Sequence, residues 1–165
     1  MSTPVEIAPL QTPPKACLPK ELVSSTAFLL AKVGMTVKMR MLDELEQAGC
    51  GMYDYGVLAV LGEGAQKTQA AIADALGVDR SQLVHVLDEL EENGLVERKR
   101  DPNDRRRHTV SITAGGKSHL VKLRSIVGRI EQSFLEPLDD EAQKALRETL
   151  LRVACNFDPR YAQPA

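Results

Sequence analysis

Apolar residues recur at every third or fourth position along most of the chain, a spacing that is typical of helices with one buried face. The first such stripe predicts a single helix from Pro19 to about Gln47, ended by Gly49. Its members are Leu22, Thr26, Leu29, Val33 and Val37. Shorter helices are predicted over residues 53–61, 69–76 and 79–93, and each is followed by a glycine, at position 62, 77 or 94, that can end it.

Two short runs favour strands. Residues 95–99 and 107–112 flank a polar turn that contains Pro102 and Asn103, which is the pattern of a hairpin. After the hairpin, Thr113 is placed to cap a long helix that Pro137 ends. Asp139 then begins a last helix that reaches Phe157.

The order of these elements predicts the fold class. A short helix, a tight turn at Gly77, a capped helix and a hairpin form a winged helix-turn-helix. We therefore expect a mostly α protein with a small β-hairpin wing and a winged core at residues 52–112. The helices at both ends, 19–48 and 114–157, carry more apolar surface than this core can cover, which predicts a homodimer. The residues expected at the dimer interface are Leu120, Leu123, Val127, Ile130, Phe134, Leu146 and Leu150.

The composition is that of an ordinary globular chain, with 165 residues of which 43% are hydrophobic and 27% are charged. Residues 1–18, which include four prolines, are typical of a flexible arm. Apolar runs all fall short of the ~20 residues of a membrane span, and no secretory leader is visible. We therefore expect a cytoplasmic protein without a membrane partner.

Catalysis, metals and cofactors are not expected. The three cysteines lack CxxC spacing, and the histidines lack the spacing of metal ligands; they are His85, His108 and His119. The chain contains no nucleophile elbow, phosphate-binding loop or H-E-x-x-H motif. A binding protein is therefore favoured over an enzyme.

Charge is distributed unevenly. The whole chain carries −2, but residues 98–108 contain six bases and two acids, which leaves +4 there and −6 elsewhere. A basic segment on an acidic body predicts phosphate binding at that one place.

Two stretches of the predicted winged core carry a recognisable pattern. One is T-Q-A-A-I-A-D-A-L-G-V-D-R-S from Thr68, and the other is L-V-E-R-K-R-D-P-N-D-R-R from Leu95, followed by V-S-I-T-A-G-G-K to Lys117. Both resemble the MarR family of multiple antibiotic resistance regulators. The D-x-x-D-R-R wing, followed by a strand, Thr and Gly, is the most specific part. The resemblance implies one domain over residues 19–157 and a homodimeric repressor or activator on a pseudo-palindromic operator in double-stranded DNA.

The helix that begins after Asp79 is the expected recognition helix. Its candidate DNA contacts lie opposite Leu83 and Leu87, and they are Ser81, Gln82, Val84 and His85. Capping of the helix is the alternative role for Ser81 and Gln82. Relatives often carry Thr and Arg where this chain has Val84 and His85, so affinity is expected to depend more on the wing.

The wing supplies the second DNA contact. The resemblance implies that Arg105 or Arg106 enters the minor groove, where a narrow groove attracts a guanidinium. Asp104 matches the family aspartate that braces the wing arginine, and Asp101 and Arg107 are expected to support the turn. The alternative is an ordinary solvated charged surface.

The resemblance also implies an effector site near the end of the first helix and the start of the second. There Arg40 could pair with the carboxylate of a small aromatic effector, beside Met39, Tyr53 and Tyr55. Core packing and a surface ion pair are the alternative. Cys17 is a second sensor hypothesis, since relatives that sense peroxide use an early cysteine, although no tyrosine pair accompanies it here.

Together these observations favour a homodimeric DNA-binding regulator, a repressor released by a small-molecule effector. The alternative is a protein-interaction module on a winged-helix fold that has lost specific DNA binding, which the acidic body favours.

Overall fold

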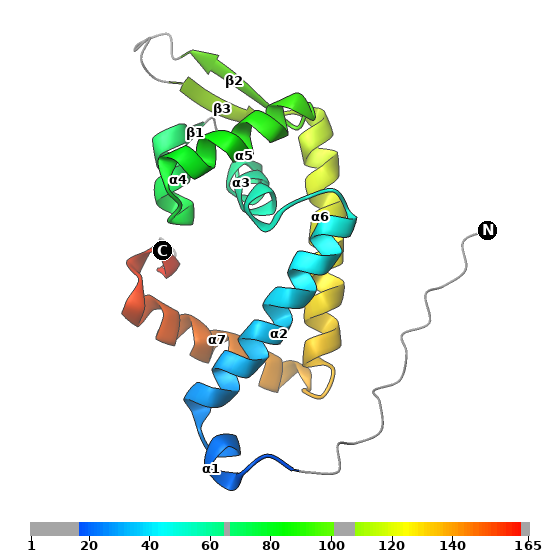
Figure 1. Ribbon diagram of the computed structural model, residues 1–165, viewed down its shortest axis with the longest axis vertical. Coiled ribbons are helices and arrows are strands. Elements are labelled where there is room, and N and C mark those ends of the chain that lie inside the picture. Colours follow the sequence, from blue (N-terminus) through cyan, green and yellow to red (C-terminus); the bar gives the residue numbers. More distant parts are fainter. Residues whose placement is uncertain (1–16, 65–66, 101–107, 163–165) are drawn as a thin grey trace, which may run out of the picture. The chain divides into compact units, whose positions relative to one another are not determined.

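The computed structural model describes residues 17–64, 67–100 and 108–162. In those ranges the chain forms seven α-helices, one 3-10 helix and three strands (Figure 1). In chain order they are α1 (Lys20–Val23), α2 (Thr26–Gln47), α3 (Met52–Gly62), β1 (Lys67–Thr68), α4 (Gln69–Leu76), α5 (Arg80–Glu92), β2 (Val96–Arg100), β3 (His108–Ile112), α6 (Ala114–Leu135), α7 (Asp140–Phe157) and η1 (Pro159–Tyr161). The prediction of a mostly helical chain with a small wing is confirmed.

The chain divides into two compact units, one ending at Thr36 and the other beginning at Val37. The first unit contains α1 and the N-terminal half of α2, and here the prediction of one continuous first helix is wrong. The Ser24 hydroxyl donates to the Glu21 carbonyl, and the Ser25 hydroxyl accepts from the Phe28 amide. Serine side chains compete with the helical backbone in this way, so the two serines end α1 and start α2 anew.

The second unit contains the winged core, with a three-stranded antiparallel sheet in the order β1–β3–β2. The hairpin pairs Val96 with Ile112 at its base and Arg100 with His108 at its outer end. Strand β1 has only two residues, and the apolar pattern of the sequence did not predict it. It pairs with β3 through the backbone, which leaves no pattern in the side chains.

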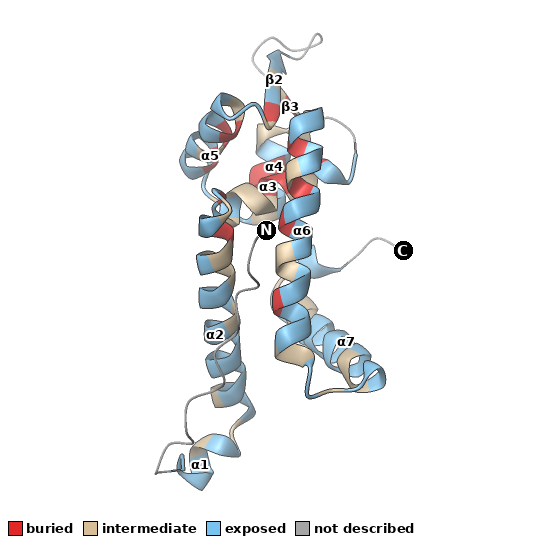
Figure 2. Cartoon of the chain, turned by 90° about the vertical axis from the view of Figure 1, so that its right-hand side faces the viewer, coloured by how far each residue is buried: buried red, intermediate tan, exposed pale blue. Residues whose placement is uncertain are grey.

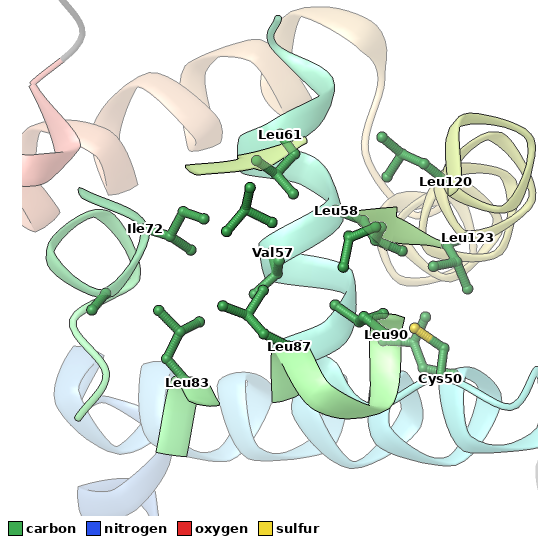
Figure 3. Packing of buried hydrophobic residues seen from close by; sticks show 14 residues of the cluster. Cys50, Val57, Leu58, Leu61, Ile72, Leu83, Leu87, Leu90, Leu120 and Leu123 are labelled. Carbon is green, nitrogen blue, oxygen red and sulfur yellow. The ribbon is translucent and has the colours of Figure 1, made fainter. Parts of the chain in front are cut away.

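The hydrophobic core surrounds α3 (Figure 3). Val57, Leu58 and Leu61 of α3 are at most 2% exposed. Leu45, near the C-terminal end of α2, joins the same core, as do buried side chains of α4, α5 and the sheet, namely Ile72, Ala73, Leu83, Leu87, Leu90, Val96 and Val110. The face predicted to be buried on the recognition helix is therefore the face that packs.

The N-terminal half of α6 closes this core, which corrects part of the expected dimer interface. Leu120 and Leu123 are buried in the core of the same chain. Helix α6 approaches α3 so closely that a Cβ added at Gly62 would lie 2.5 Å from a methyl carbon of Leu120. These two leucines are therefore buried within the chain and are not available for contact with a second copy.

The start of α6 is tied to the end of α5 and the beginning of β2. The Thr113 side-chain oxygen accepts from the Gly116 amide at 3.0 Å and caps α6, as predicted, while its hydroxyl donates to the Gly94 carbonyl at 2.7 Å. The Thr113 amide donates to the Leu95 carbonyl at 3.0 Å. A side chain at Gly116 would overlap that carbonyl. Within the described ranges, no helix is both long enough and apolar enough to cross a membrane.

Candidate nucleic-acid interface

The helix-turn-helix is built by two side-chain caps and one glycine. The Thr68 hydroxyl oxygen accepts from the Ala71 amide at 3.2 Å and starts α4. Gly77 ends α4 in the left-handed region, with φ of +64°, a conformation that other residues adopt at a cost. Asp79 then starts α5 by accepting from the Ser81 amide at 2.7 Å. The chain therefore turns sharply between two well-ended helices.

The outward face of α5 presents the predicted reading residues to solvent. Ser81, Gln82 and His85 are exposed, and Val84 is 41% exposed. Figure 2 shows α5 on the surface with its buried residues confined to one side. An exposed face at the start of the second helix is the part of a helix-turn-helix that contacts base edges.

Ser81 and Gln82 differ in which of their hydrogen-bonding groups remain unused within the chain. The Ser81 hydroxyl donates to Asp79, and the bonds from Ser81 hold the pKa of the Asp79 carboxyl below its ordinary value. Ser81 therefore takes part in capping, and only its lone pairs remain for a ligand. For the Gln82 side-chain amide, the described part of the chain shows no hydrogen-bond partner, so its donor and acceptor both remain usable there.

The wing is fastened to α5 by one arginine. The guanidinium of Arg98, on β2, contacts Asp88 at 2.7 Å and Glu91 at 2.6 Å, two acids that lie one turn apart on α5. The Arg98 side chain is 22% exposed. Hydrogen bonds from Arg98 hold the pKa of Glu91 below its ordinary value, and Glu91 and Asp88 raise the pKa of Arg98.

This arrangement corrects the predicted charge of the wing. Of the six bases in residues 98–108, Arg98 is matched by Asp88 and Glu91, and Lys99 lies 2.9 Å from Glu97. All three acids lie outside the segment whose charge was counted, so the count along the chain overstated the local excess. The i,i+3 spacing of Asp88 and Glu91 was the signal that could have revealed the contact.

The remaining wing candidates are outside the described residues. They are the proposed minor-groove residues Arg105 and Arg106, with the supporting residues Asp101, Asp104 and Arg107. Their roles stay predictions.

The four residues of the predicted effector site have different surroundings. Arg40 forms an ion pair with Glu44 at 2.7 Å, and the other Glu44 oxygen lies 3.9 Å from Arg129 of α6. Tyr55 packs against the core. Met39 and Tyr53 are about half exposed, at 58% and 49%. The alternative roles, core packing and a surface ion pair, are therefore seen for Tyr55 and Arg40.

The helices at the two ends of the chain expose many apolar side chains. On α2 these are Leu29, Leu30, Val33, Met35 and Met39, and on α7 they are Leu146, Leu150, Leu151, Val153 and Phe157. Of the predicted interface residues on α6, Val127 and Phe134 are half-buried and Ile130 is 3% exposed. A shallow hollow of about 480 Å³ on α7 is lined by Thr149, Arg152, Val153, Asn156 and Phe157.

The cysteines divide into exposed and shielded thiols. Cys17 is exposed, whereas Cys50 lies in the core, where burial raises the pKa of its thiol to about 12. Cys50 therefore stays protonated and unreactive at neutral pH. In the part of the chain that the structure describes, His, Cys, Asp and Glu side chains do not gather into a group that could hold a metal ion.

The caps, the α4–α5 turn and the antiparallel hairpin together define a winged helix-turn-helix protein. The model of the MarR family matches residues 52–107. Among solved structures, the regulator CouR from Rhodococcus jostii RHA1, bound to p-coumaroyl-CoA, is 32% identical with a TM-score of 0.70, and the match covers 82% of this chain and 96% of CouR. The transcriptional repressor CouR bound to a 23-mer DNA duplex is 29% identical with a TM-score of 0.75, covering 84% of this chain and 99% of that one. The chain belongs to the MarR family.

A curated relative from Thauera aromatica, a putative transcriptional regulatory protein for the hcr operon, is 37% identical over 99 residues. The match spans 60% of this chain and 60% of that protein's length. These relatives are transcriptional regulators rather than enzymes, as the sequence predicts for this chain.

Proposed function

We propose that the chain is a homodimeric transcriptional regulator that binds a pseudo-palindromic operator in double-stranded DNA and represses from it until a small-molecule effector releases it. The observation that carries this proposal is the exposed first turn of α5, which follows a capped turn and stands beside a wing fastened by Arg98. The DNA complex of CouR, which matches over 84% of this chain, supports the same use of the fold.

Sequence would be read by α5. Gln82 can pair with the N6 and N7 edge of adenine, His85 can donate to a base acceptor, and the Val84 methyl groups can contact a thymine methyl. Arg105 and Arg106 would add phosphate or minor-groove contacts that report the shape of the DNA.

Two copies would associate through the terminal helices. The exposed apolar side chains on α7 include Leu150 and Val153, at 41% and 44%, and large exposed apolar groups of this number mark interaction surfaces. A dimer would cover them and set the spacing of the two reading helices.

The effector is proposed to be an aromatic acid or its thioester, since CouR binds p-coumaroyl-CoA. Arg40 is the candidate anchor for an anionic group. Because Arg40 is already paired with Glu44 at 2.7 Å, an anionic effector would have to compete with that carboxylate. Such a regulator would act in the cytoplasm, where its operator is.

A protein-interaction module is the second candidate, favoured by the acidic residues in the C-terminal half of α5. Two of them, Asp88 and Glu91, are matched by Arg98, which weakens this alternative.

Fluorescence anisotropy with the intergenic DNA upstream of the gene tests the proposal. We expect saturable binding, with a clear loss on a scrambled duplex of the same composition and a steep fall as salt rises. Equal binding to both duplexes, or no binding at low salt, would contradict the proposal and favour the interaction module.

A further inference from the structure

The C-terminal end of the chain returns to the helix-turn-helix. Nη1 of Arg160, in η1, donates to the main-chain carbonyl of Asp74 in α4 at 3.3 Å, across 86 positions of sequence. Figure 1 shows the end of α7 and η1 beside α4. The helix-turn-helix and the C-terminal segment that follows α7 are thus joined directly.

The carbonyl that Arg160 contacts needs a partner. The last four carbonyls of a helix have no hydrogen-bond partner within the helix. At the end of α4, the Ala73 carbonyl accepts hydrogen bonds from the amides of both Gly77 and Val78. The Asp74 carbonyl is satisfied by Arg160 instead. Helix α4 has no basic residue in its own last turn, so Arg160 also supplies the positive charge that a helix C-terminus favours.

Arg160 is oriented for this contact by Asp158. The Asp158 carboxylate accepts from Nε and from the amide of Arg160, each at 2.9 Å, and it also contacts Nη2. The Asp158 amide in turn donates to the Ala154 carbonyl of α7 at 3.0 Å. The guanidinium is therefore positioned relative to α7 as well as to α4.

Gly77 makes room for the guanidinium. A Cβ added at Gly77 would overlap the end of the Arg160 side chain, whereas a Cβ at Gly94, another glycine with a positive φ, would meet no atom within 4 Å. Because that end is the tip of a flexible side chain, an alanine at Gly77 would displace the guanidinium from the Asp74 carbonyl.

We propose that residues 158–161 form a C-terminal strap that couples α7 to the turn before the recognition helix, with Arg160 as its positioning residue. Its effect on DNA rests on the proposed function, because α5 must read DNA for the strap to matter there. A movement of α7 would then also move the start of α5, because Arg160 is bonded to the Asp74 carbonyl in the helix that precedes the turn.

Hydrogen exchange in the absence of DNA tests the strap itself. Arg160→Met keeps the length of the side chain and removes the donors, and it should speed exchange of the Gly77 and Val78 amides about three- to tenfold. Arg147→Met, an exposed arginine of α7, is the matched control and should leave these amides unchanged. Equal exchange in wild type and Arg160→Met would overturn the strap.

The two glycines offer a second test that separates backbone strain from displacement of Arg160. Gly77→Ala and Gly94→Ala both place alanine at a positive φ, of +64° and +69°. Gly77→Ala should lower Tm more than Gly94→Ala, and most of that difference should vanish when Arg160→Met is present. A difference that persists in the Arg160→Met background would overturn the strap.

Operator binding separates the strap from the proposed function. If wild-type protein binds its operator, Arg160→Met should weaken that binding several-fold without changing the dimer. Faster exchange with unchanged operator affinity would overturn the coupling to DNA reading. If wild-type protein binds no DNA, the proposed function fails, and the exchange and Tm results still decide whether the strap exists.

Discussion

Arg98 and Glu91 join the wing to α5 through the main chain and the side chain at once. The Glu91 carboxylate accepts from the amide of Arg98 at 2.9 Å, from Nε at 2.9 Å and from Nη2 at 2.6 Å. A strand whose own amide is held by a helical side chain cannot swing away from that helix without breaking all of these bonds. The direction of the wing is therefore set by α5.

Replacing Arg98 should damage stability and DNA binding together. Arg98→Met removes charge-assisted bonds to two carboxylates and should lower the free energy of unfolding by about 1–2 kcal/mol, because the pair is partly exposed. Denaturant unfolding measures this loss. Lys99→Met is the matched control, since Lys99 is 62% exposed and pairs with one exposed acid, and it should cost less than about 0.5 kcal/mol. An equal loss of unfolding free energy in the two variants would contradict the role of Arg98 in holding the wing to α5.

Stability should fall on the acid side. The pKa values of Glu91, Glu97 and Asp158 are held below their ordinary values by hydrogen bonds from Arg98, Lys99 and Arg160. A carboxyl with a lowered pKa stabilises the fold above its unfolded pKa, near pH 4, and loses that effect as the pH falls through the folded value. Tm should therefore be level from pH 7 to about pH 5 and fall below about pH 4. In Arg98→Met the decrease of Tm at low pH should be smaller than in wild type. An identical decrease would contradict the contribution assigned to the Arg98–Glu91 pair.

Gln82 should carry sequence preference. A base contact discriminates by about 1–3 kcal/mol, whereas a phosphate contact affects all sequences alike. Gln82→Ala should therefore reduce the difference in affinity between operator DNA and scrambled DNA, while the affinity for scrambled DNA stays nearly unchanged. Ser81→Ala is the comparison, since its hydroxyl bonds to Asp79, and it should lower helix stability more than preference. Equal loss on both duplexes would return Gln82 to a capping or backbone role.

A charge on α7 should separate the proposed dimer. Leu150→Asp places a carboxylate on a side chain that is 41% exposed in the single chain, so the monomer should fold and fail to associate. Ile130→Asp is unsuitable, because Ile130 is 3% exposed and its loss would disturb the chain itself. Val121→Asp, on an exposed valine in the N-terminal half of α6, is the control and should stay dimeric. Light scattering measures the mass of each variant in solution. A wild-type protein that is monomeric at micromolar concentration would contradict the proposed dimer.

Arg105 and Arg106 should account for much of the salt dependence of DNA binding. Because Arg98 and Lys99 are matched by acids, the positive charge available to DNA depends on the other bases of the wing. Each phosphate contact contributes about 0.9 to the slope of log affinity against log salt, so the double alanine variant should lose up to about two units per subunit. Thermal melting should be nearly unchanged. A variant with unchanged affinity and slope would exclude the wing from the interface.

Local signals in the sequence predicted the winged core well, because caps and glycines act within a few residues. Thr68, Gly77 and Asp79 bound α4 and α5 as their chemistry requires. The periodicity of α6 was also correct, but a periodic stripe says only that a face is apolar, not what covers it. Leu120 and Leu123 were therefore expected at a dimer interface, and they pack on α3 of the same chain.

Contacts between distant segments could not be predicted in this way. The bond from Arg160 to Asp74 joins positions 86 residues apart, and no local motif marks it. For the contact of Arg98 with α5, the only local signal was the i,i+3 spacing of Asp88 and Glu91. The same reason explains the overstated charge of residues 98–108 and the missed strand β1. Of the candidate site, the face of α5 could be predicted from helical spacing, whereas the partners that orient it could not.

The linkage at Thr113 has a consequence for how the chain folds. The bonds from Thr113 to Gly94 and Leu95 span 19 and 18 residues, and the cap of α6 uses the same side chain. Opening the end of α5 or the base of the hairpin would therefore remove bonds from the residue that caps α6. The hairpin and the N-terminal half of α6 should form and open as one cooperative unit, so neither would persist as an independent element in a partly unfolded chain.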